Sequence, residues 1–209
     1  MTDAPDPPVA DSVFGFWSSR PFKGAKTPAV LHAETRLHED WLFIASLDEA
    51  VVSIHPPGGA APAHDFEVVG ADNRRQLVFL VPQAADPARR SSVLSSVAAA
   101  DKAGDECRVV EEAEVLREPR LRNARLVFGC RKVRVSPTDR LQILHHLGQH
   151  SGRSNLLETS ECVRTTPEAA ECVLALVTEG TVMVDVERTL GPEMPVWRVR
   201  TEADEDEGY

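Results

Sequence analysis

Residues 64–83 (HDFEVVGADNRRQLVFLVPQ) constrain the fold more than any other stretch, because they predict a β-hairpin. Two runs rich in β-branched and aromatic residues, 66–69 and 77–81, flank the turn-forming segment Gly-Ala-Asp-Asn at 70–73. Asp65 stands immediately before the first run. The hairpin fixes two neighbouring antiparallel strands, and the other elements can be placed relative to that pair.

Helical and strand patterns on both sides of the hairpin predict an α/β domain. Upstream, apolar residues at helical spacing predict a helix over 33–47, and residues 51–54 predict a strand. Downstream, the Asp-Pro pair at 86–87 supplies an N-cap and a first helical position for a helix that ends near Gly104. Residues 107–110 predict the next strand, so the order is α-β-β-β-α-β.

The second half of the chain shows a different pattern. Residues 136–139 (Ser-Pro-Thr-Asp) begin a helix with a cap, a proline at the first position and an acid at the third. Residues 154–163 predict a short second helix, and residues 166–168 begin a third. Strands follow at 182–186 and 196–199. Three helices followed by a hairpin predict a winged-helix domain.

Residues 117–134, between these two parts, are unusually basic, with Glu118 as the sole acid. Side chains of this kind bind DNA phosphates and release counterions, which makes the affinity depend on salt. The alternative is an ordinary exposed face of a folded element. We expect DNA contact here from seven residues: Arg117, Arg120, Arg122, Arg125, Arg131, Lys132 and Arg134.

The net charge of −10 does not exclude nucleic acid, because the acids are concentrated at the two ends. Residues 1–12 hold three acids and residues 201–209 hold five, without Lys or Arg, which leaves −2 for the rest. We expect both ends to be solvated, disordered tails. The expected organisation is a tail (1–12), an α/β domain (13–116), a basic connector (117–135), a winged-helix-like domain (136–200) and an acidic tail (201–209).

The sequence also narrows the cellular setting. It contains no apolar run of membrane-spanning length and no basic-then-apolar signal at its start. Its four cysteines lack the spacing of a metal site, so we expect free thiols. These features predict a cytoplasmic protein without a membrane partner, associated with the nucleoid if it binds DNA.

Several segments, in their order along the chain, resemble the TnsA family of transposon endonucleases. Residues 34–57 (ETRLHEDWLFIASLDEAVVSIHPP) are similar to its helix-to-strand segment, and residues 64–66 (HDF) to its P-D-F motif. Residues 114–130 resemble its basic connector, and residues 136–199 its C-terminal domain. The resemblance implies a restriction-endonuclease-like α-β-β-β-α-β core followed by a winged-helix domain. It also implies Mg²⁺-dependent DNA cleavage within a transposition complex.

Carrying the family's site onto this sequence gives an incomplete set of residues. Asp65 matches the family aspartate that holds Mg²⁺. The helix glutamate of the family falls near Glu34, His38 or Glu39, and the alignment leaves all three open.

The second strand lacks the family's remaining groups. Its Gln-x-Lys positions fall on Phe79 and Val81, which can neither bind a metal nor stabilise charge on a phosphate. Gln83 lies two residues too late, and Lys102 is the lysine nearest in sequence. Were the protein active, its catalytic residues would be Glu34, Glu39, Asp65 and Lys102, with Mg²⁺ as cofactor at Asp65.

Three functions follow from this pattern. The first is a DNA-binding regulatory or accessory protein that has a catalytically degenerate TnsA-like fold and needs no cofactor. The second is an active Mg²⁺-dependent TnsA-like endonuclease with a displaced site. The third is a protein-interaction adaptor of a DNA-processing complex, in which neither domain touches DNA.

Two features of the C-terminal part refine these expectations. The third helix, residues 167–179, carries three glutamates and no Lys or Arg, so it would repel DNA. We expect it to pack inward or to meet a protein partner, and Arg153, Arg164 and Arg188 remain candidates for phosphate contact. His146 and His150 have metal-ligand spacing, but no third ligand accompanies them, so no metal site is predicted.

Overall fold

The computed structural model describes residues 19–58 and 63–199, so the expected tails at 1–12 and 201–209 lie outside the described residues. The fold is mixed α/β. The strands are β1 (Arg20–Phe22), β2 (Leu31–Ala33), β3 (Val51–His55), β4 (Phe66–Gly70), β5 (Arg75–Val81), β6 (Glu106–Glu111), β7 (Arg153–Asn155), β8 (Val182–Val184) and β9 (Pro195–Arg198). The helices are α1 (Arg36–Leu47), α2 (Pro87–Ala103), α3 (Glu112–Val115), α4 (Arg120–Gly129), α5 (Pro137–Gln149), α6 (Leu156–Ser160) and α7 (Ala169–Thr178), with a 3-10 turn, η1 (Cys130–Lys132).

The predicted hairpin is the β4–β5 pair at the centre of a four-stranded sheet. Phe66 lies opposite Val78 in this antiparallel pair, and Asn73 in the connecting turn has a φ of 60°. The sheet order is β3-β4-β5-β6, and the β5–β6 pair is parallel because α2 crosses between them. The predicted order α-β-β-β-α-β is present as α1, β3, β4, β5, α2 and β6.

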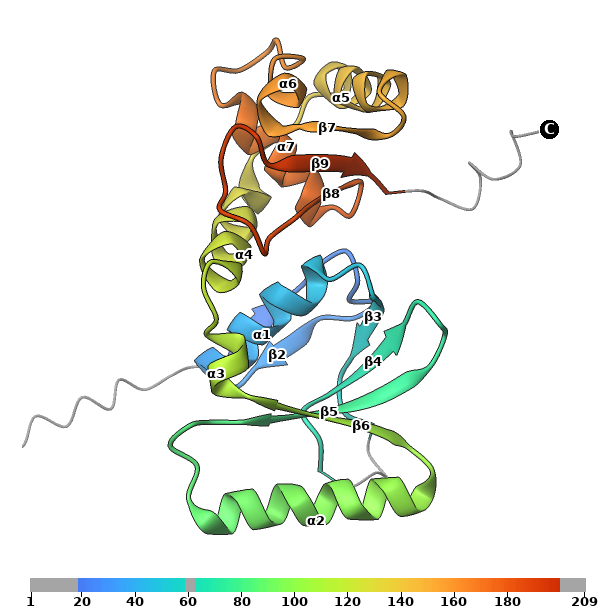
Figure 1. The fold of residues 1–209 in the computed structure, drawn as a ribbon, viewed down its shortest axis with the longest axis vertical. Coiled ribbons are helices and arrows are strands. Elements are labelled where there is room, and N and C mark those ends of the chain that lie inside the picture. The colour runs from blue at the N-terminus through green and yellow to red at the C-terminus, as the bar shows by residue number, and fades with distance from the viewer. Residues whose placement is uncertain (1–18, 59–62, 200–209) are drawn as a thin grey trace, which may run out of the picture.

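Each face of this sheet packs against a different helix (Figure 1). Val78 and Leu80 point to the side of α1, whereas Leu77, Phe79 and Val81 form a separate cluster on the side of α2. This alternation follows from the two-residue repeat of a strand, and it explains why β5 is apolar throughout.

The first helix begins later in the chain than the sequence predicted, because a short strand and a helix cap precede it. The helix begins at Arg36 and not at 33, because the Thr35 side chain accepts a hydrogen bond from the His38 N–H and caps it. The preceding residues form β2, which pairs with β1. Three-residue strands carry too little periodic signal to predict from sequence.

The basic connector contains a helix, α4, that the sequence pattern did not predict. Leu121, Ala124, Val127 and Phe128 are buried at helical spacing beneath the arginines. Phe128 lies 4.7 Å from Phe43 of α1, measured between ring centroids. Through α4 a single hydrophobic core runs from the sheet to the C-terminal elements.

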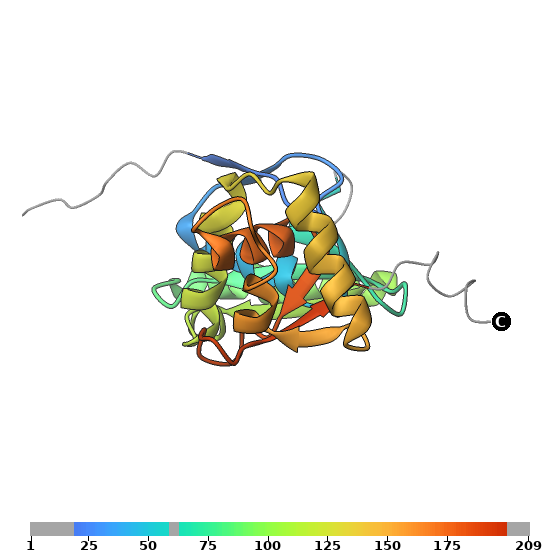
Figure 2. The ribbon, with the colours of Figure 1, turned by 90° about the horizontal axis from the view of Figure 1, so that it is seen from above.

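The C-terminal elements form three helices and a small antiparallel sheet of order β7-β9-β8. Viewed from above, they lie over the rest of the molecule (Figure 2). Residues 172–177 of α7 are all buried, so the third helix packs inward, as expected. The β8–β9 loop packs on α4, because the Asn123 amide donates to the Val186 oxygen at 2.9 Å and also to the Arg188 oxygen. No described helix is both long and apolar enough to span a bilayer.

Candidate functional site

Asp65 lies immediately before β4 and joins three elements of the core. One carboxylate oxygen, Oδ1, lies 3.3 Å from His38 Nε2 on α1, and the other, Oδ2, accepts the Leu80 N–H at 2.6 Å. Its own N–H donates to the Val78 oxygen at 2.9 Å. The chain's own groups therefore engage both oxygens of this carboxylate.

Of the three helix positions left open by the resemblance, His38 is the one that contacts Asp65. Its ring meets Phe66 edge-on, and its Nδ1 is buried without a hydrogen-bond partner among the described residues. Glu39 pairs with Arg20 at 3.4 Å, and Glu34 is exposed ahead of the helix cap. A histidine thus stands where the resemblance implies a carboxylate.

The residues of β5 near Asp65 differ from those inferred from the sequence. Phe79 and Val81, the expected Gln-x-Lys positions, point to the α2 side of the sheet. Leu80, whose N–H binds Asp65, points to the α1 side. This register correction leaves the chemistry unchanged, because all three side chains are apolar and buried.

Lys102 does not approach Asp65. It lies in the last turn of α2, which leads directly into Glu106 at the start of β6. Glu106 is opposite Gln76, at the start of β5, whereas Asp65 meets Leu80 near the end of β5. Within residues 19–58 and 63–199, no three His, Cys, Asp or Glu side chains are grouped so as to hold a metal ion.

His146 and His150 are engaged in contacts within the C-terminal elements. Their rings lie 4.3 Å apart, and His146 Nε2 is 3.0 Å from Ser154 Oγ, which donates to Glu158 at 2.8 Å. Burial, together with the nearby His150, lowers the pKa of His146. The His146 imidazole therefore links α5 to β7 and α6.

Three of the seven connector cations are paired with carboxylates of the chain. Arg125 binds Asp40 through two hydrogen bonds of 2.8 and 2.6 Å. Glu187 of the β8–β9 loop forms ion pairs with Arg120 at 3.0 Å and with Arg117 at 2.7 Å. These arginines hold the connector against neighbouring elements.

The other four are exposed, and Arg164 is a fifth exposed cation. Arg122 lies on the exposed face of α4, which leads into η1 and the residues after it. The Arg164 N–H donates to Asp139 Oδ1 at 2.9 Å, so the Arg164 backbone lies beside the first turn of α5, which begins three residues after Arg134. We call this set the cationic ridge: Arg122, Arg131, Lys132, Arg134 and Arg164.

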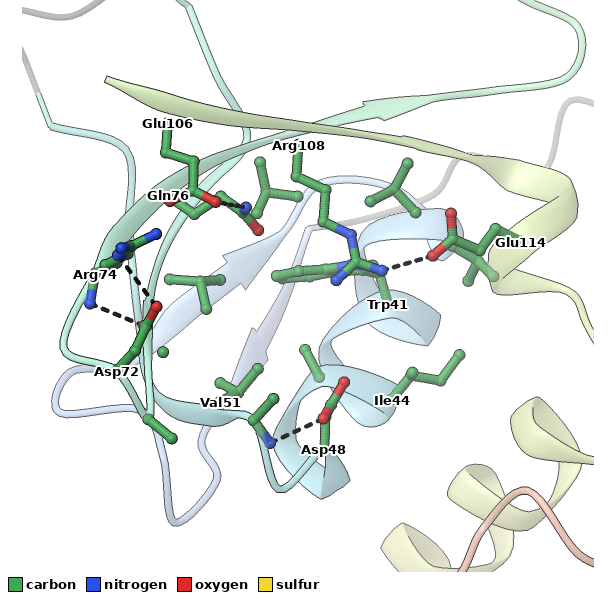
Figure 3. A pocket seen from close by; sticks show the side chains of 18 of the residues that line it. Trp41, Ile44, Asp48, Val51, Asp72, Arg74, Gln76, Glu106, Arg108 and Glu114 are labelled. Atoms are coloured by element: carbon green, nitrogen blue, oxygen red, sulfur yellow. Dashed lines mark hydrogen bonds and ion pairs between the residues drawn. The ribbon is translucent and has the colours of Figure 1, made fainter. Parts of the chain in front are cut away.

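A separate cleft of about 380 Å³ opens on the α1 side of the sheet, and Asp72 and Arg74 of the β4–β5 turn line one part of it (Figure 3). Trp41 forms part of its apolar wall. Gln76 donates to Glu106 at 2.9 Å, and Arg108 donates to Glu114 at 2.7 Å, so its polar groups largely satisfy one another. No motif in the sequence marked these residues as a site, although Glu106 and Arg108 interrupt the apolar pattern of β6 on the side that faces α1.

No protein-family model matches this chain, and no curated protein matches it. The similarity to the TnsA family is therefore a prediction that rests on the motifs.

Proposed function

We propose that this protein is a DNA-binding regulatory or accessory factor that has a nuclease-like core and does not cleave DNA. The observation that carries the proposal is the cationic ridge. Most other arginines of the described residues bind carboxylates, whereas Arg122, Lys132 and Arg134 are exposed and close in sequence. Such a group favours the phosphate backbone, which supplies much of the affinity of DNA-binding proteins.

The absence of cleavage rests on Asp65 and its neighbours. Metal-assisted phosphodiester cleavage needs several oxygen ligands around Mg²⁺ and a cation near the phosphate. At this position His38 and the Leu80 N–H bind the one carboxylate, and β5 contributes apolar side chains. A protein of this kind would hold DNA or position a catalytic partner.

The element order supports the finer fold assignments within this proposal. The order α1-β3-β4-β5-α2-β6 fits a restriction-endonuclease-like core, and α5-β7-α6-α7-β8-β9 fits a winged-helix domain. In a helix-turn-helix protein the recognition helix enters the major groove. Here residues 172–177 of α7 are buried and the β8–β9 loop packs on α4, so contact with DNA would be mainly to phosphates.

A binding and cleavage experiment tests this function. The full chain is titrated into linear and supercoiled DNA, with and without Mg²⁺ or Mn²⁺. We expect binding in all cases and no nicking. Nicking that Asp65→Ala abolishes would favour the endonuclease instead.

A second candidate, an adaptor that binds proteins and not DNA, is favoured by the outer face of α5. Leu141 is 68% exposed there, and Leu144, His145 and Gly148 lie beside it along the same face. An adaptor predicts no DNA binding even at low salt, which distinguishes it from the first proposal.

A further inference from the structure

The two edges of the four-stranded sheet differ in how they are covered. The outer strand β3 is irregular between Val51 and Ser53, and its Ile54 N–H donates to the Lys26 oxygen at 2.8 Å. The opposite outer strand, β6, pairs with β5 over six successive residues without a register shift. Within the described parts of the chain, no other backbone segment hydrogen-bonds to the outer side of β6. An uncovered, regular edge of this kind is a template for another strand.

The side chains of β6 are self-complementary for one particular pairing. Glu106 and Arg108 point to the α1 side of the sheet, into the cleft of Figure 3, and Cys107 between them points to the α2 side. In an antiparallel pair with a two-fold axis at Cys107, each Arg108 lies opposite Glu106 of the other copy. Centring the axis on Arg108 would place two arginines opposite each other, which is unfavourable.

An apolar strip lies beside the same edge. Val109 of β6 is 40% exposed and Leu94 of α2 is 66% exposed. Arg90 binds Glu111 at 3.1 Å, which places that face of α2 on the β6 side, and Leu94 follows Arg90 by one helical turn. A second copy paired at the start of β6 would lie next to this strip.

We propose that β6 pairs in antiparallel fashion with β6 of a second copy of this chain, with the two-fold axis at Cys107. Residues 106–108 of the two strands then pair and join the two four-stranded sheets, and two Glu106–Arg108 ion pairs span the junction. This inference does not depend on DNA binding.

Charge reversal tests the interface directly in the full chain. Sedimentation velocity over a wide concentration range should show wild type moving from 22.9 kDa toward twice that mass. Arg108→Glu places like charges opposite each other and should raise the dissociation constant at least about tenfold. The double variant Glu106→Arg/Arg108→Glu exchanges the charges and should restore the dimer.

The control variant Glu114→Gln removes the intrachain partner of Arg108 and should leave the dimer intact. A wild-type monomer at every concentration would overturn the proposal. A dimer that Arg108→Glu leaves unchanged, or that the double variant does not restore, would also overturn it.

Oxidative cross-linking tests the register. Two Cys107 thiols on the axis should form an intermolecular disulfide with diamide, which accepts the two hydrogens as the S–S bond forms. Burial raises the pKa of the Cys107 thiol, so the reaction is run at alkaline pH. Cys107→Ser should abolish the cross-linked dimer, and a variant with Cys130, Cys162 and Cys172 changed to Ser should retain it. A dimer that does not cross-link through Cys107 would contradict the register.

Discussion

Arg125 of α4 binds both carboxylate oxygens of Asp40 on α1, with Nε–Oδ1 and Nη2–Oδ2 distances of 2.8 and 2.6 Å. The Asp40 side chain is only 3% exposed, and the next cation, Arg36, is 3.7 Å from it. Planar, two-bond geometry of this kind is the strongest form of an arginine–carboxylate pair. It joins the connector to the sheet-bearing part of the fold.

Replacing Arg125 with alanine should destabilise the protein by about 3–5 kcal/mol, because a buried carboxylate loses its main partner. Urea denaturation measures the change. Arg122→Ala on the exposed face of the same helix is the matched control and should change stability by no more than about 0.5 kcal/mol. Equal effects of the two substitutions would contradict a structural role for the Arg125–Asp40 pair.

Asp65→Asn should cost about 1 kcal/mol or less, because an amide oxygen can still accept the Leu80 N–H. Asp65→Ala should cost more, about 1–3 kcal/mol, since it leaves that N–H unpaired. Thermal melts with and without Mg²⁺ check the assignment. A large loss in Asp65→Asn that is specific to Mg²⁺-containing buffer would instead reveal a bound ion.

Gly180→Ala should destabilise the contact between the two halves by about 1–3 kcal/mol. Gly180 has a φ of 74°, and an added Cβ would lie 2.9 Å from the Ala25 Cβ. Gly148→Ala, in helix α5 with nothing within 4 Å, is the control, and it should stabilise by about 0.5–1 kcal/mol. The free energies of unfolding of the two variants, measured by chemical denaturation, should therefore change in opposite directions relative to wild type.

Asp139 should contribute stability that is lost in acid. The Asp139 carboxylate accepts hydrogen bonds from the Arg164 N–H and the Thr165 hydroxyl. These bonds, the first more than the second, lower the pKa of Asp139 below the usual aspartate value. Because the folded state favours the ionised form, this contribution is complete above the usual aspartate pKa and disappears as the pH falls through the lowered one. The stability difference between wild type and Asp139→Asn should therefore shrink below about pH 4. A stability difference between the two proteins that does not change with pH would contradict this role of the ionised Asp139.

Local signals in the sequence were sufficient for much of the fold. The helix caps at Asp86 and Ser136 and the end at Gly104 are where the sequence predicted them, because these residues act on backbone groups within a few positions. The hairpin around Asn73 was predicted for the same reason.

Long-range features could not be predicted in this way. Helix α4 was not predicted because arginines lie between its apolar positions and weaken the helical pattern. The Arg125–Asp40 pair could not be predicted because its two residues are 85 positions apart in the sequence. The basic run therefore contained residues with two different roles, some paired within the fold and some exposed. On β5 a shift of one residue decided whether Phe79 or Leu80 lay on the Asp65 side, and a strand that is buried on both faces gives no polar residue to fix that register.

The most direct test of the proposed function is the salt dependence of DNA binding by the cationic ridge. Affinities of wild type and Arg122→Ala/Arg134→Ala are measured across a salt series, with Arg89→Ala, an exposed arginine of α2, as the control. Losing two phosphate contacts should weaken binding to every DNA sequence and reduce the log–log salt slope by roughly 2. The control should retain the wild-type slope. Superimposable slopes for all three proteins, or no binding by wild type at low salt, would contradict the account.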